Sequence, residues 1–335
     1  MTIWDLESSL TSYPHQWQRP AKTEEWVWEY LAESKHKSNF IEFISFPWAT
    51  LIDSKLRNKT DQIRDMKVIL SSLAPKRKLI RATVCQHVNL MEAISEFLEL
   101  KITDIFWPHK VIGMDLIEGI RIHPFVLYPY GYYQGGMDYC IDLDSPKYLY
   151  SFLGAYDPGC YISNIREIIF RLQLNRMGFI KRRNSWHFEN DVYAQNINGK
   201  TLSDFEVRSQ KDNLEEYIYI MINSLFSLCP SGAGPNSIRY WESIAMGAVP
   251  VLLSDTWESP KVDNIYPGVK VNENSINSFV ISIQKSYSNN RIKIDFEEAI
   301  FGAKYNRNIE PIKWLDSIFD DFFSNKSINK LLGMS

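Results

Sequence analysis

The sequence has 335 residues, and at roughly 100–200 residues per domain this length corresponds to two domains or one large one. Hydrophobic residues make up 45% of the chain and charged residues 23%, which is typical of a globular protein and excludes a disordered, collagen-like or coiled-coil chain. The formal net charge of -3 and the isoelectric point near 6.1 give no overall positive field, so we expect no nucleic-acid partner.

Cysteines and apolar segments indicate the compartment. Cys85, Cys140, Cys160 and Cys229 lie far apart without C-x-x-C spacing, which argues against a disulfide framework and a structural zinc site. The N-terminal residues MTIWDLE are acidic where a signal peptide requires basic residues. The longest apolar run, Ile244–Leu253, is about ten residues, well short of the roughly 20 that span a bilayer. We therefore expect a cytoplasmic protein, with peripheral contact to the inner membrane left open.

Strand-like and helix-like segments alternate along the first 130 residues. Short apolar segments bounded by proline or polar residues predict strands at 40–45, 79–85, 104–107 and 125–128. Apolar residues at helical spacing predict helices at 61–73 and 89–100. This alternation predicts a mostly parallel α/β sheet.

A domain boundary is predicted where this periodicity lapses, between Tyr130 and Pro146, in a stretch rich in glycine and other turn residues. The first domain is then 1–145 and the second 146–335, with the last helix able to pack back on the first domain.

Periodicity restarts in the second domain. It predicts a strand at 148–153, a helix from Asn164 to about residue 173 and another at 213–223. Asn164 and Glu167 resemble a capping box at the start of the first of these helices. Two α/β domains in series are therefore expected.

The stretch from Leu225 to Pro260 reads as one βαβ unit. A strand at 225–229 is followed by the loop Ser231–Pro235, a helix starting at Asn236 or Ser237 and ending at Gly247, and a strand at 249–253. In a parallel crossover, the loops after both strands lie at the same carboxyl edge of the sheet, where ligands bind. A glycine loop and a helix N-terminus together predict a phosphate-binding site.

Arg239 and Glu242 lie three residues apart on the expected helix, on a stripe away from Trp241. A cation in the first turn suits a diphosphate and an acid one turn later suits a ribose; a solvated surface pair is the alternative. Ser237 occupies the third position of a G-x-G-x-x-G pattern, and no Gly-Lys-Ser/Thr follows, so dinucleotide and P-loop sites are both disfavoured.

This stretch resembles the donor-binding signature of exostosin-like glycosyltransferases, here as a bacterial-type cytoplasmic member. The similarity is carried by Cys229–Gly232, Ser237–Arg239, Glu242, Gly247–Val251 and Ser254–Asp255. A weaker similarity covers Lys147–Gly154 and the helix that bears Arg166. Ala233 and Ala245 depart from the family pattern.

The resemblance implies a GT-B fold, with two Rossmann-like domains and a cleft between them. It implies an inverting transferase that moves a sugar from a nucleotide sugar, expected to be UDP-linked, to a glycan or glycolipid acceptor in surface polysaccharide biosynthesis. The donor lies mainly on the second domain and no metal ion or other cofactor is needed. The expected donor-binding residues are Arg166, Ser231, Gly232, Ser237, Arg239, Glu242 and Asp255.

An inverting reaction also needs a general base, expected from the first domain. His109 is the first candidate because it follows the strand at 104–107 and an unperturbed histidine has a pKa near 6.5. Asp138 is the second, and Asp115 and Glu118 are rivals. The D-x-D pattern Asp142–Asp144, which could hold manganese, lies in the boundary stretch and is interpreted as ordinary loop.

Alternatives remain open at this point. A nucleotide-sugar epimerase or a retaining GT-B transferase would share the second domain, and a non-catalytic nucleotide- or glycan-binding protein is a further alternative. The basic clusters 76–78 and 181–183 are interpreted as solvated faces, or as contacts to an anionic acceptor or lipid.

Overall fold

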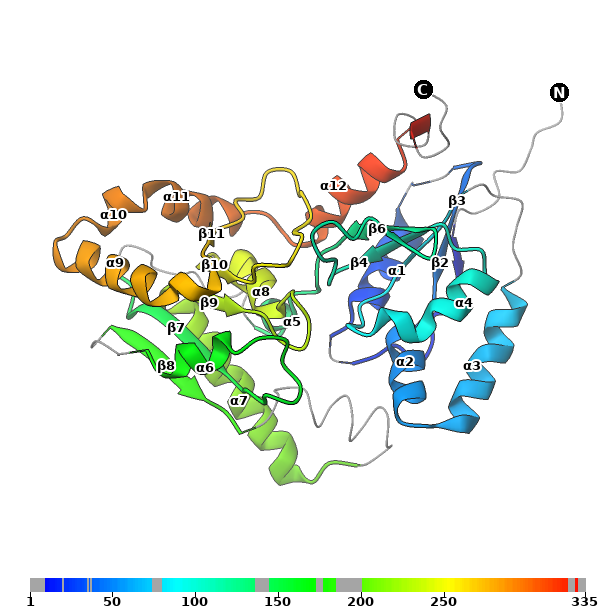
Figure 1. Ribbon diagram of the computed structural model, residues 1–335, viewed down its shortest axis with the longest axis horizontal. Helices are drawn as coiled ribbons and strands as arrows, with labels where there is room; N and C mark the ends of the chain where they lie inside the picture. Colours follow the sequence, from blue (N-terminus) through cyan, green and yellow to red (C-terminus); the bar gives the residue numbers. More distant parts are fainter. Residues whose placement is uncertain are drawn as a thin grey trace. The chain divides into compact units, whose positions relative to one another are not determined.

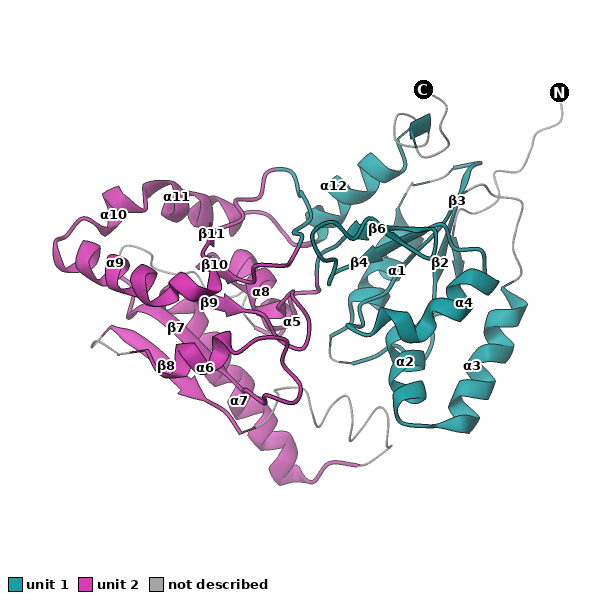
Figure 2. Ribbon diagram, in the orientation of Figure 1, with its two compact units in different colours: residues 1–126, 258–263, 312–335 teal, residues 127–257, 264–311 magenta. Residues whose placement is uncertain are grey.

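The computed structural model describes residues 10–19, 21–34, 36, 38–73, 80–135, 145–172, 177–184, 201–324 and 329–330. The chain forms two compact units (Figure 2). Unit 1 consists of Met1–Val126, Glu258–Asp263 and Ile312–Ser335, and unit 2 of Leu127–Trp257 and Asn264–Pro311.

Unit 1 contains a mainly parallel sheet with the strand order β1-β2-β3-β4-β6-β5 (Figure 1). Its strands are β1 (Leu10–Ser12), β2 (Ile41–Ser45), β3 (Ile80–Val84), β4 (Asp104–Trp107), β5 (Leu116–Ile117) and β6 (Ile120–Pro124). Neighbouring strands pair in parallel, except that β5 is antiparallel to β6. Every residue of β2, β3 and β4 is buried, as expected for parallel strands covered on both faces.

Helices cover both faces of the unit 1 sheet. They are α1 (Thr23–Glu33), α2 (Trp48–Leu56), α3 (Thr60–Ser72), the 3-10 turn η1 (Leu90–Ala93), α4 (Ile94–Glu99) and α12 (Ile312–Phe322). Successive strand residues point to opposite faces. Ile44 and Ile105 belong to a core shared with α2, α3 and α4. The adjacent Phe43 and Phe106 instead contact Phe319 of α12 edge to face, with ring centroids 5.6 and 5.3 Å away.

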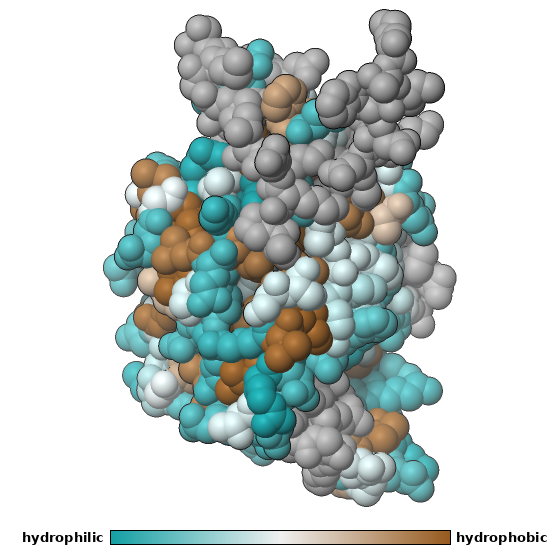
Figure 3. All heavy atoms as spheres, turned by 90° about the vertical axis from the view of Figure 1, so that its right-hand side faces the viewer, coloured by the Kyte–Doolittle hydropathy of each residue, from teal (hydrophilic) through white to brown (hydrophobic). Residues whose placement is uncertain are grey.

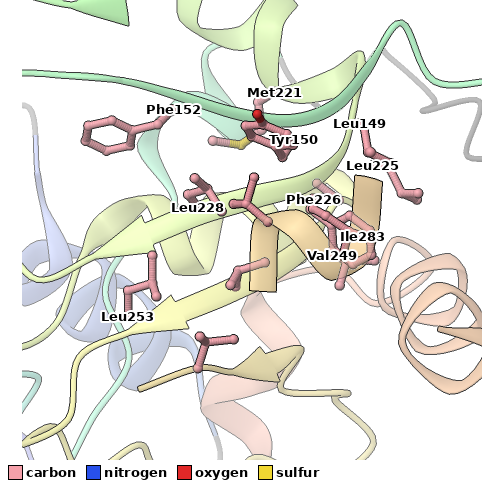
Figure 4. Close-up of a cluster of buried hydrophobic side chains, with 14 of the residues drawn as sticks. Leu149, Tyr150, Phe152, Met221, Leu225, Phe226, Leu228, Val249, Leu253 and Ile283 are labelled. Atoms are coloured by element: carbon pink, nitrogen blue, oxygen red, sulfur yellow. The ribbon is translucent and has the colours of Figure 1, made fainter. Parts of the chain in front are cut away.

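Unit 2 contains a parallel sheet with the strand order β11-β10-β9-β7-β8. Its strands are β7 (Tyr148–Gly154), β8 (Gly178–Arg182), β9 (Ser224–Pro230), β10 (Val249–Leu253) and β11 (Val269–Lys270). Its helices are α5 (Tyr130–Tyr133), α6 (Ile165–Phe170), α7 (Asp204–Ile222), α8 (Ile238–Met246), the 3-10 turn η4 (Glu273–Ser275), α9 (Ile276–Ser288), α10 (Ile292–Asp295) and α11 (Glu297–Asn306). Figure 4 shows the core, where side chains from β7, β9 and β10 lie together with Met221 of α7 and Ile283 of α9.

Most expected strands and helices are present, but one strand was predicted wrongly. Residues 125–128 are not a strand. The preceding strand, β6, makes its last pairing at Pro124, opposite Trp107, and the chain leaves the sheet there. The four residues are buried in an irregular segment, and this burial explains their strand-like composition. In β6 itself Ile120 and Ile122 are buried, whereas Arg121 and His123 are only partly so.

Two helices differ from expectation at their ends. Helix α7 begins at Asp204, where Ser203 and Glu206 form a capping box, and so starts earlier than the predicted helix at 213–223. Its first turns were missed because they carry exposed apolar residues such as Phe205 and therefore lack an amphipathic pattern. Helix α6 begins after Asn164, but the Asn164 side chain makes no capping hydrogen bond. The Ser163 hydroxyl accepts the hydrogen bond from the Ile165 N–H instead, at 3.3 Å.

The two units divide the chain after Val126 rather than at residue 145. Residues 127–135 belong to unit 2, where the Gly131 N–H of α5 donates to Glu242 Oε1 of α8 at 2.7 Å. A Cβ atom at Gly131 would lie 2.9 Å from the same oxygen, so this close approach requires glycine. A glycine that serves helix packing looks like a linker residue in the sequence.

Among the described residues, no helix combines the length and the apolar character that crossing a bilayer requires. Figure 3 shows one face of the molecule, where apolar side chains form separate areas among hydrophilic ones. Exposed large apolar side chains of unit 1 include Leu56, Val68, Met91 and Leu98. Such residues are common on protein surfaces and do not by themselves mark an interaction site.

Candidate functional site

The β9–α8–β10 crossover places two loops at one edge of the unit 2 sheet. The register pairs Val251 with Leu228 and Leu253 with Pro230, in parallel. Beyond the strands, the Ser231 N–H donates to the Leu253 carbonyl at 3.0 Å. The prediction that the loops after β9 and β10 share the carboxyl edge is therefore confirmed.

The glycine loop is held from both sides. The Gly232 N–H donates to the Gly234 carbonyl at 2.9 Å, and the Ile162 N–H donates to the Gly232 carbonyl at 3.0 Å. A Cβ atom at Gly232 would lie 3.3 Å from Nη2 of Arg166. The absence of a side chain here therefore leaves room for a guanidinium group beside the loop.

Helix α8 begins at the expected place. Ser237 is its N-cap residue, with extended backbone, although its side chain makes no capping hydrogen bond. The Asn236 Oδ1 accepts a hydrogen bond from Trp241 Nε1 at 3.2 Å, which ties the loop to the helix. Gly247 ends the helix in the left-handed conformation, with φ of 77°, as its position predicted.

Arg166 of α6 reaches the glycine loop. Its Nε donates to the Ser231 carbonyl at 2.8 Å and its Nη1 to the Ala155 carbonyl at 3.0 Å. The guanidinium lies 4.4 Å from the Tyr161 ring centroid. Burial, together with the nearby charge of Arg239, lowers the pKa of Arg166 to about 10, although Tyr161 opposes the shift.

Arg239 of α8 is buried beside Arg166. Its Nη2 donates to the Leu153 carbonyl, and its guanidinium lies 4.9 Å from the ring centroid of Phe152 and 4.8 Å from that of Tyr217. Within the described part of the chain, neither Arg166 nor Arg239 has a carboxylate within 4.0 Å. Two neighbouring cations thus lie at the sheet edge, held by carbonyls and rings, and among the described residues neither forms an ion pair, although Glu242 lies near enough to Arg239 to interact with its charge.

Glu242 is also buried, at 2% exposure, so the alternative of a solvated Arg239–Glu242 surface pair is wrong. Its Oε1 accepts the Gly131 N–H, and its Oε2 accepts the hydroxyl of Tyr217 from α7. Burial raises the pKa of Glu242, and these two hydrogen bonds and Arg239 oppose the shift. The carboxylate therefore joins α5, α7 and α8, and both of its oxygens are engaged within unit 2.

Glu273 is a site residue that sequence reasoning missed. It follows β11 in η4, and its Oε1 lies 3.5 Å from the Ser231 hydroxyl. The expected donor ligand Asp255 is exposed and accepts the Glu273 N–H at 3.3 Å. A single acid in a polar stretch gives no sequence signal, because only the fold brings the end of β11 to the loops after β9 and β10.

The candidate bases belong to unit 1 or lie outside the described residues. His109 follows β4 and is buried, and burial lowers its pKa to about 3, with the charge of His87 contributing. The expectation of a pKa near 6.5 is therefore wrong. Asp115 is exposed and paired with Lys110 at 2.7 Å, and Glu118 is exposed in a turn. Asp138, Asp142 and Asp144 lie outside the described residues.

The carboxyl edge of the unit 1 sheet also carries a buried acid. Glu24 of α1 accepts backbone N–H groups from Gln86, after β3, and from Ala49 of α2, at 3.0 and 3.2 Å. Burial raises the pKa of Glu24 to about 8. In the residues that the structure describes, no three or more His, Cys, Asp or Glu side chains lie together as metal ligands would.

Part of the chain is similar in sequence to known proteins. Residues 160–287 match the family model described as the exostosin GT47 domain. The chain is 32% identical over 130 residues to a Caenorhabditis elegans protein described as "Exostosin-1 homolog", covering 36% of this chain and 29% of that protein. The chain thus spans less than a third of the length of this relative.

The matched region contains most of the site in unit 2. Arg166, Ser231, Arg239, Glu242 and Glu273 all fall within it. Residues 160–287 are therefore similar to the glycosyltransferase domain of the exostosins, and this similarity covers the edge of the unit 2 sheet where the two arginines meet.

Proposed function

We propose that this protein is a glycosyltransferase that uses a nucleoside-diphosphate sugar as donor and binds it at the carboxyl edge of the unit 2 sheet. The similarity of residues 160–287 to the exostosin GT47 domain supports the reaction class. Two units with parallel sheets are consistent with the GT-B architecture, which we propose for the whole chain.

The neighbouring guanidinium groups of Arg166 and Arg239, neither of which has a carboxylate within 4.0 Å in the described part of the chain, are the observation that carries the proposal. Arg239 is buried and Arg166 partly so, and two such cations repel each other more strongly than they would in water unless an anion lies between them. A diphosphate brings two or more negative charges and accepts charge-assisted hydrogen bonds from guanidinium groups. Ser231 and Gly232, beside Arg166, add a hydroxyl and a backbone that a phosphate can approach closely.

The chemistry follows from this placement. In the transfer step a bond forms between the acceptor oxygen and the anomeric carbon, the bond from that carbon to the diphosphate oxygen breaks, and the diphosphate leaves with the electron pair. Arg166 and Arg239 would stabilise the charge that develops on the leaving group without a metal ion. The acceptor hydroxyl gives its proton to a base.

We propose an inverting reaction, in which that base is a protein side chain, with Asp138 as the candidate and Asp115 and Glu118 as its rivals. A neutral His109 with a pKa of about 3 is a weak proton acceptor at neutral pH. We further propose that the acceptor is a glycan or lipid-linked glycan of a surface polysaccharide and that the protein acts in the cytoplasm.

Calorimetric titration with UDP, GDP and ADP tests the donor site. Wild-type protein is expected to bind at least one of them, and Arg166→Gln to weaken that binding by about 10-fold or more, as for loss of a charge-assisted hydrogen bond. Arg171→Gln is the matched control, because Arg171 follows α6, is exposed and pairs with Glu167 at the surface. Equal losses in both variants, or no binding by wild type, would contradict the proposal.

A further inference from the structure

Helix α11 presents two large aromatic side chains to solvent on one stripe. Phe301 is 70% exposed, and Tyr305, four residues later, is 48% exposed. Residues four apart are neighbours on a helix surface, so the two rings form one continuous apolar area rather than two scattered residues. We propose that this face binds a second copy of the same chain, with the two α11 helices antiparallel and Phe301 at the two-fold axis.

The opposite side of α11 is fully used within unit 2, where the helix packs on α8 and β10 (Figure 1). Its buried residues are Ala299, Ile300, Gly302, Ala303 and Asn306. A Cβ atom at Gly302 would lie 2.2 Å from Cγ of Tyr266, so only glycine permits this approach. Asn306 Oδ1 accepts the Tyr266 N–H and Nδ2 donates to the Tyr266 carbonyl, both at 2.8 Å. These contacts fix the rotation of α11 and keep Phe301 and Tyr305 on the outer side.

The charges on the outer side are self-complementary. Glu298 lies three residues before Phe301 and Lys304 three residues after it. An antiparallel pair with its two-fold axis at Phe301 brings positions equally far before and after this residue face to face. Glu298 of each copy then faces Lys304 of the other, and Glu297 faces Tyr305, whose hydroxyl can donate to the carboxylate. A parallel pair would instead place like charges together, so the charges select the antiparallel arrangement.

A second copy fits this face better than an anionic lipid surface does. Glu297 and Glu298 are exposed beside the aromatic rings, and a negatively charged membrane would repel them. An apolar centre flanked by both signs of charge matches itself after a two-fold rotation. Because a single short helix face buries little area, the dimer should be weak and dependent on concentration.

The proposed dimer face leaves the donor site free. Gly247 ends α8, and a Cβ atom there would lie 3.0 Å from Cβ of Arg307, which follows α11. The proposed donor site lies at the opposite end of α8, next to Ser237, and the nine residues of this helix span about 13 Å. Changes on the outer side of α11 should therefore not affect nucleotide binding.

Sedimentation velocity of the full chain tests the dimer at about 1–200 µM, a range in which weak dimers are populated. Wild type should show a reversible monomer–dimer equilibrium. Phe301→Ser should weaken the dimer by about 10-fold or more, because a central aromatic anchor is lost. Ile281→Ser is the control, since Ile281 is also exposed, at 63%, but lies on α9, and it should leave the equilibrium unchanged.

A charge exchange tests which residues face each other. Glu298→Lys and Lys304→Glu, each studied alone, should dimerise about 5-fold or more weakly than wild type, because each homodimer then opposes like charges. An equimolar mixture of the two variants should recover the wild-type affinity as a heterodimer, since both facing pairs are then opposite in sign. Loss in each variant and recovery in the mixture together identify Glu298 of one copy as the partner of Lys304 of the other.

The contrary outcomes are equally distinct. A wild type that stays monomeric up to about 200 µM overturns the dimer, and so does undiminished association of Phe301→Ser, which would place the contact elsewhere. Absence of recovery in the mixture overturns the antiparallel pairing. Monomeric protein that sediments with phosphatidylglycerol vesicles, and no longer does so as Phe301→Ser, would make this face a lipid-binding surface. Calorimetry should give Phe301→Ser the nucleotide affinity of wild type, so failure of the dimer leaves the donor site standing.

Discussion

Arg166 and Arg239 lie against the same aromatic ring, that of Phe152, with their guanidinium carbons 5.6 and 4.9 Å from its centroid. The negative faces of the ring offset part of the repulsion between the two cations. Each guanidinium also donates to a backbone carbonyl, so their positions are set before any ligand binds. A preorganised pair of this kind favours an anion that can contact both groups.

Removal of the second arginine should weaken nucleotide binding. Arg239→Gln is expected to lower the affinity for the bound nucleoside diphosphate by about 10- to 100-fold, from loss of roughly 1.5–3 kcal/mol. Because both arginines contact one ligand, the double variant with Arg166→Gln should lose less than the sum of the single losses. Calorimetry measures these affinities, with Arg291→Gln, a change at an exposed residue before α10, as control. Unchanged affinity in folded Arg239→Gln would exclude the phosphate role.

The Tyr217–Glu242 contact should contribute to stability. Tyr217→Phe removes the hydroxyl that Glu242 accepts and should lower the free energy of unfolding by about 1–3 kcal/mol, because a buried carboxylate loses one of its two partners. Urea unfolding measures the change. Tyr219→Phe is the matched control on the same helix, since Tyr219 is exposed and accepts a hydrogen bond from Lys147 at the surface. Equal effects of the two changes would show that the contact is unimportant.

Glu24 should make unit 1 less stable as the pH rises. Its pKa is raised from 4.5 to about 8, so its contribution is fully present below pH 4.5 and is lost as the pH rises to about 8. Between about pH 5.5 and 7 the free energy of unfolding should fall by about 1.4 kcal/mol per pH unit from this group. Glu24→Gln should remove that slope in urea unfolding, whereas Glu29→Gln, on the exposed side of α1, should keep it.

His109 should make the protein less stable to unfolding at low pH, in contrast to Glu24. Its pKa is lowered from 6.5 to about 3, so its contribution to stability is present above pH 6.5 and is lost as the pH falls toward 3. His109→Gln should therefore reduce the acid sensitivity of unfolding, and His15→Gln, an exposed change, should not. We also expect His109→Gln to retain turnover within a few-fold. A collapse of turnover with intact nucleotide binding would restore His109 as the base.

Turnover should survive removal of divalent metal ions. Because two guanidinium groups can balance the leaving diphosphate, we expect activity in the presence of EDTA. The double change Asp142→Asn and Asp144→Asn should leave turnover within a few-fold. Strict dependence on manganese that is lost with these two changes would instead place a metal ion at the D-x-D pattern and contradict the GT-B proposal.

Local pattern was sufficient to predict the elements that position the donor site. The β9–α8–β10 crossover, its cap at Ser237 and its end at Gly247 all lie in one continuous stretch of sequence, where periodicity and turn chemistry act over short range. The same reasoning could not find Glu273, because its contact with Ser231 joins residues that are 42 positions apart. It could not distinguish a buried Glu242 from a solvated one either, since helical spacing is the same for both.

The errors share one physical cause, which is burial created by tertiary structure. Residues 125–128 look like a strand because they are apolar, and they are apolar because they are buried in an irregular segment. The pKa of His109 was expected at its unperturbed value because the sequence contains no information on how deeply the ring lies in unit 1. Gly131 looks like a linker residue although it seats one helix against another.

The order in which the chain is synthesised gives α12 a particular role in folding. Phe319 lies fully buried against Phe43 and Phe106, yet it is made after the whole of unit 2. The unit 1 sheet therefore leaves the ribosome with Phe43 and Phe106 not yet covered by α12, and this apolar area stays exposed to self-association until the late helix docks. Unit 2 has all its segments by residue 311 and can complete its own core first, so the half of the protein that begins translation is the half that finishes folding last.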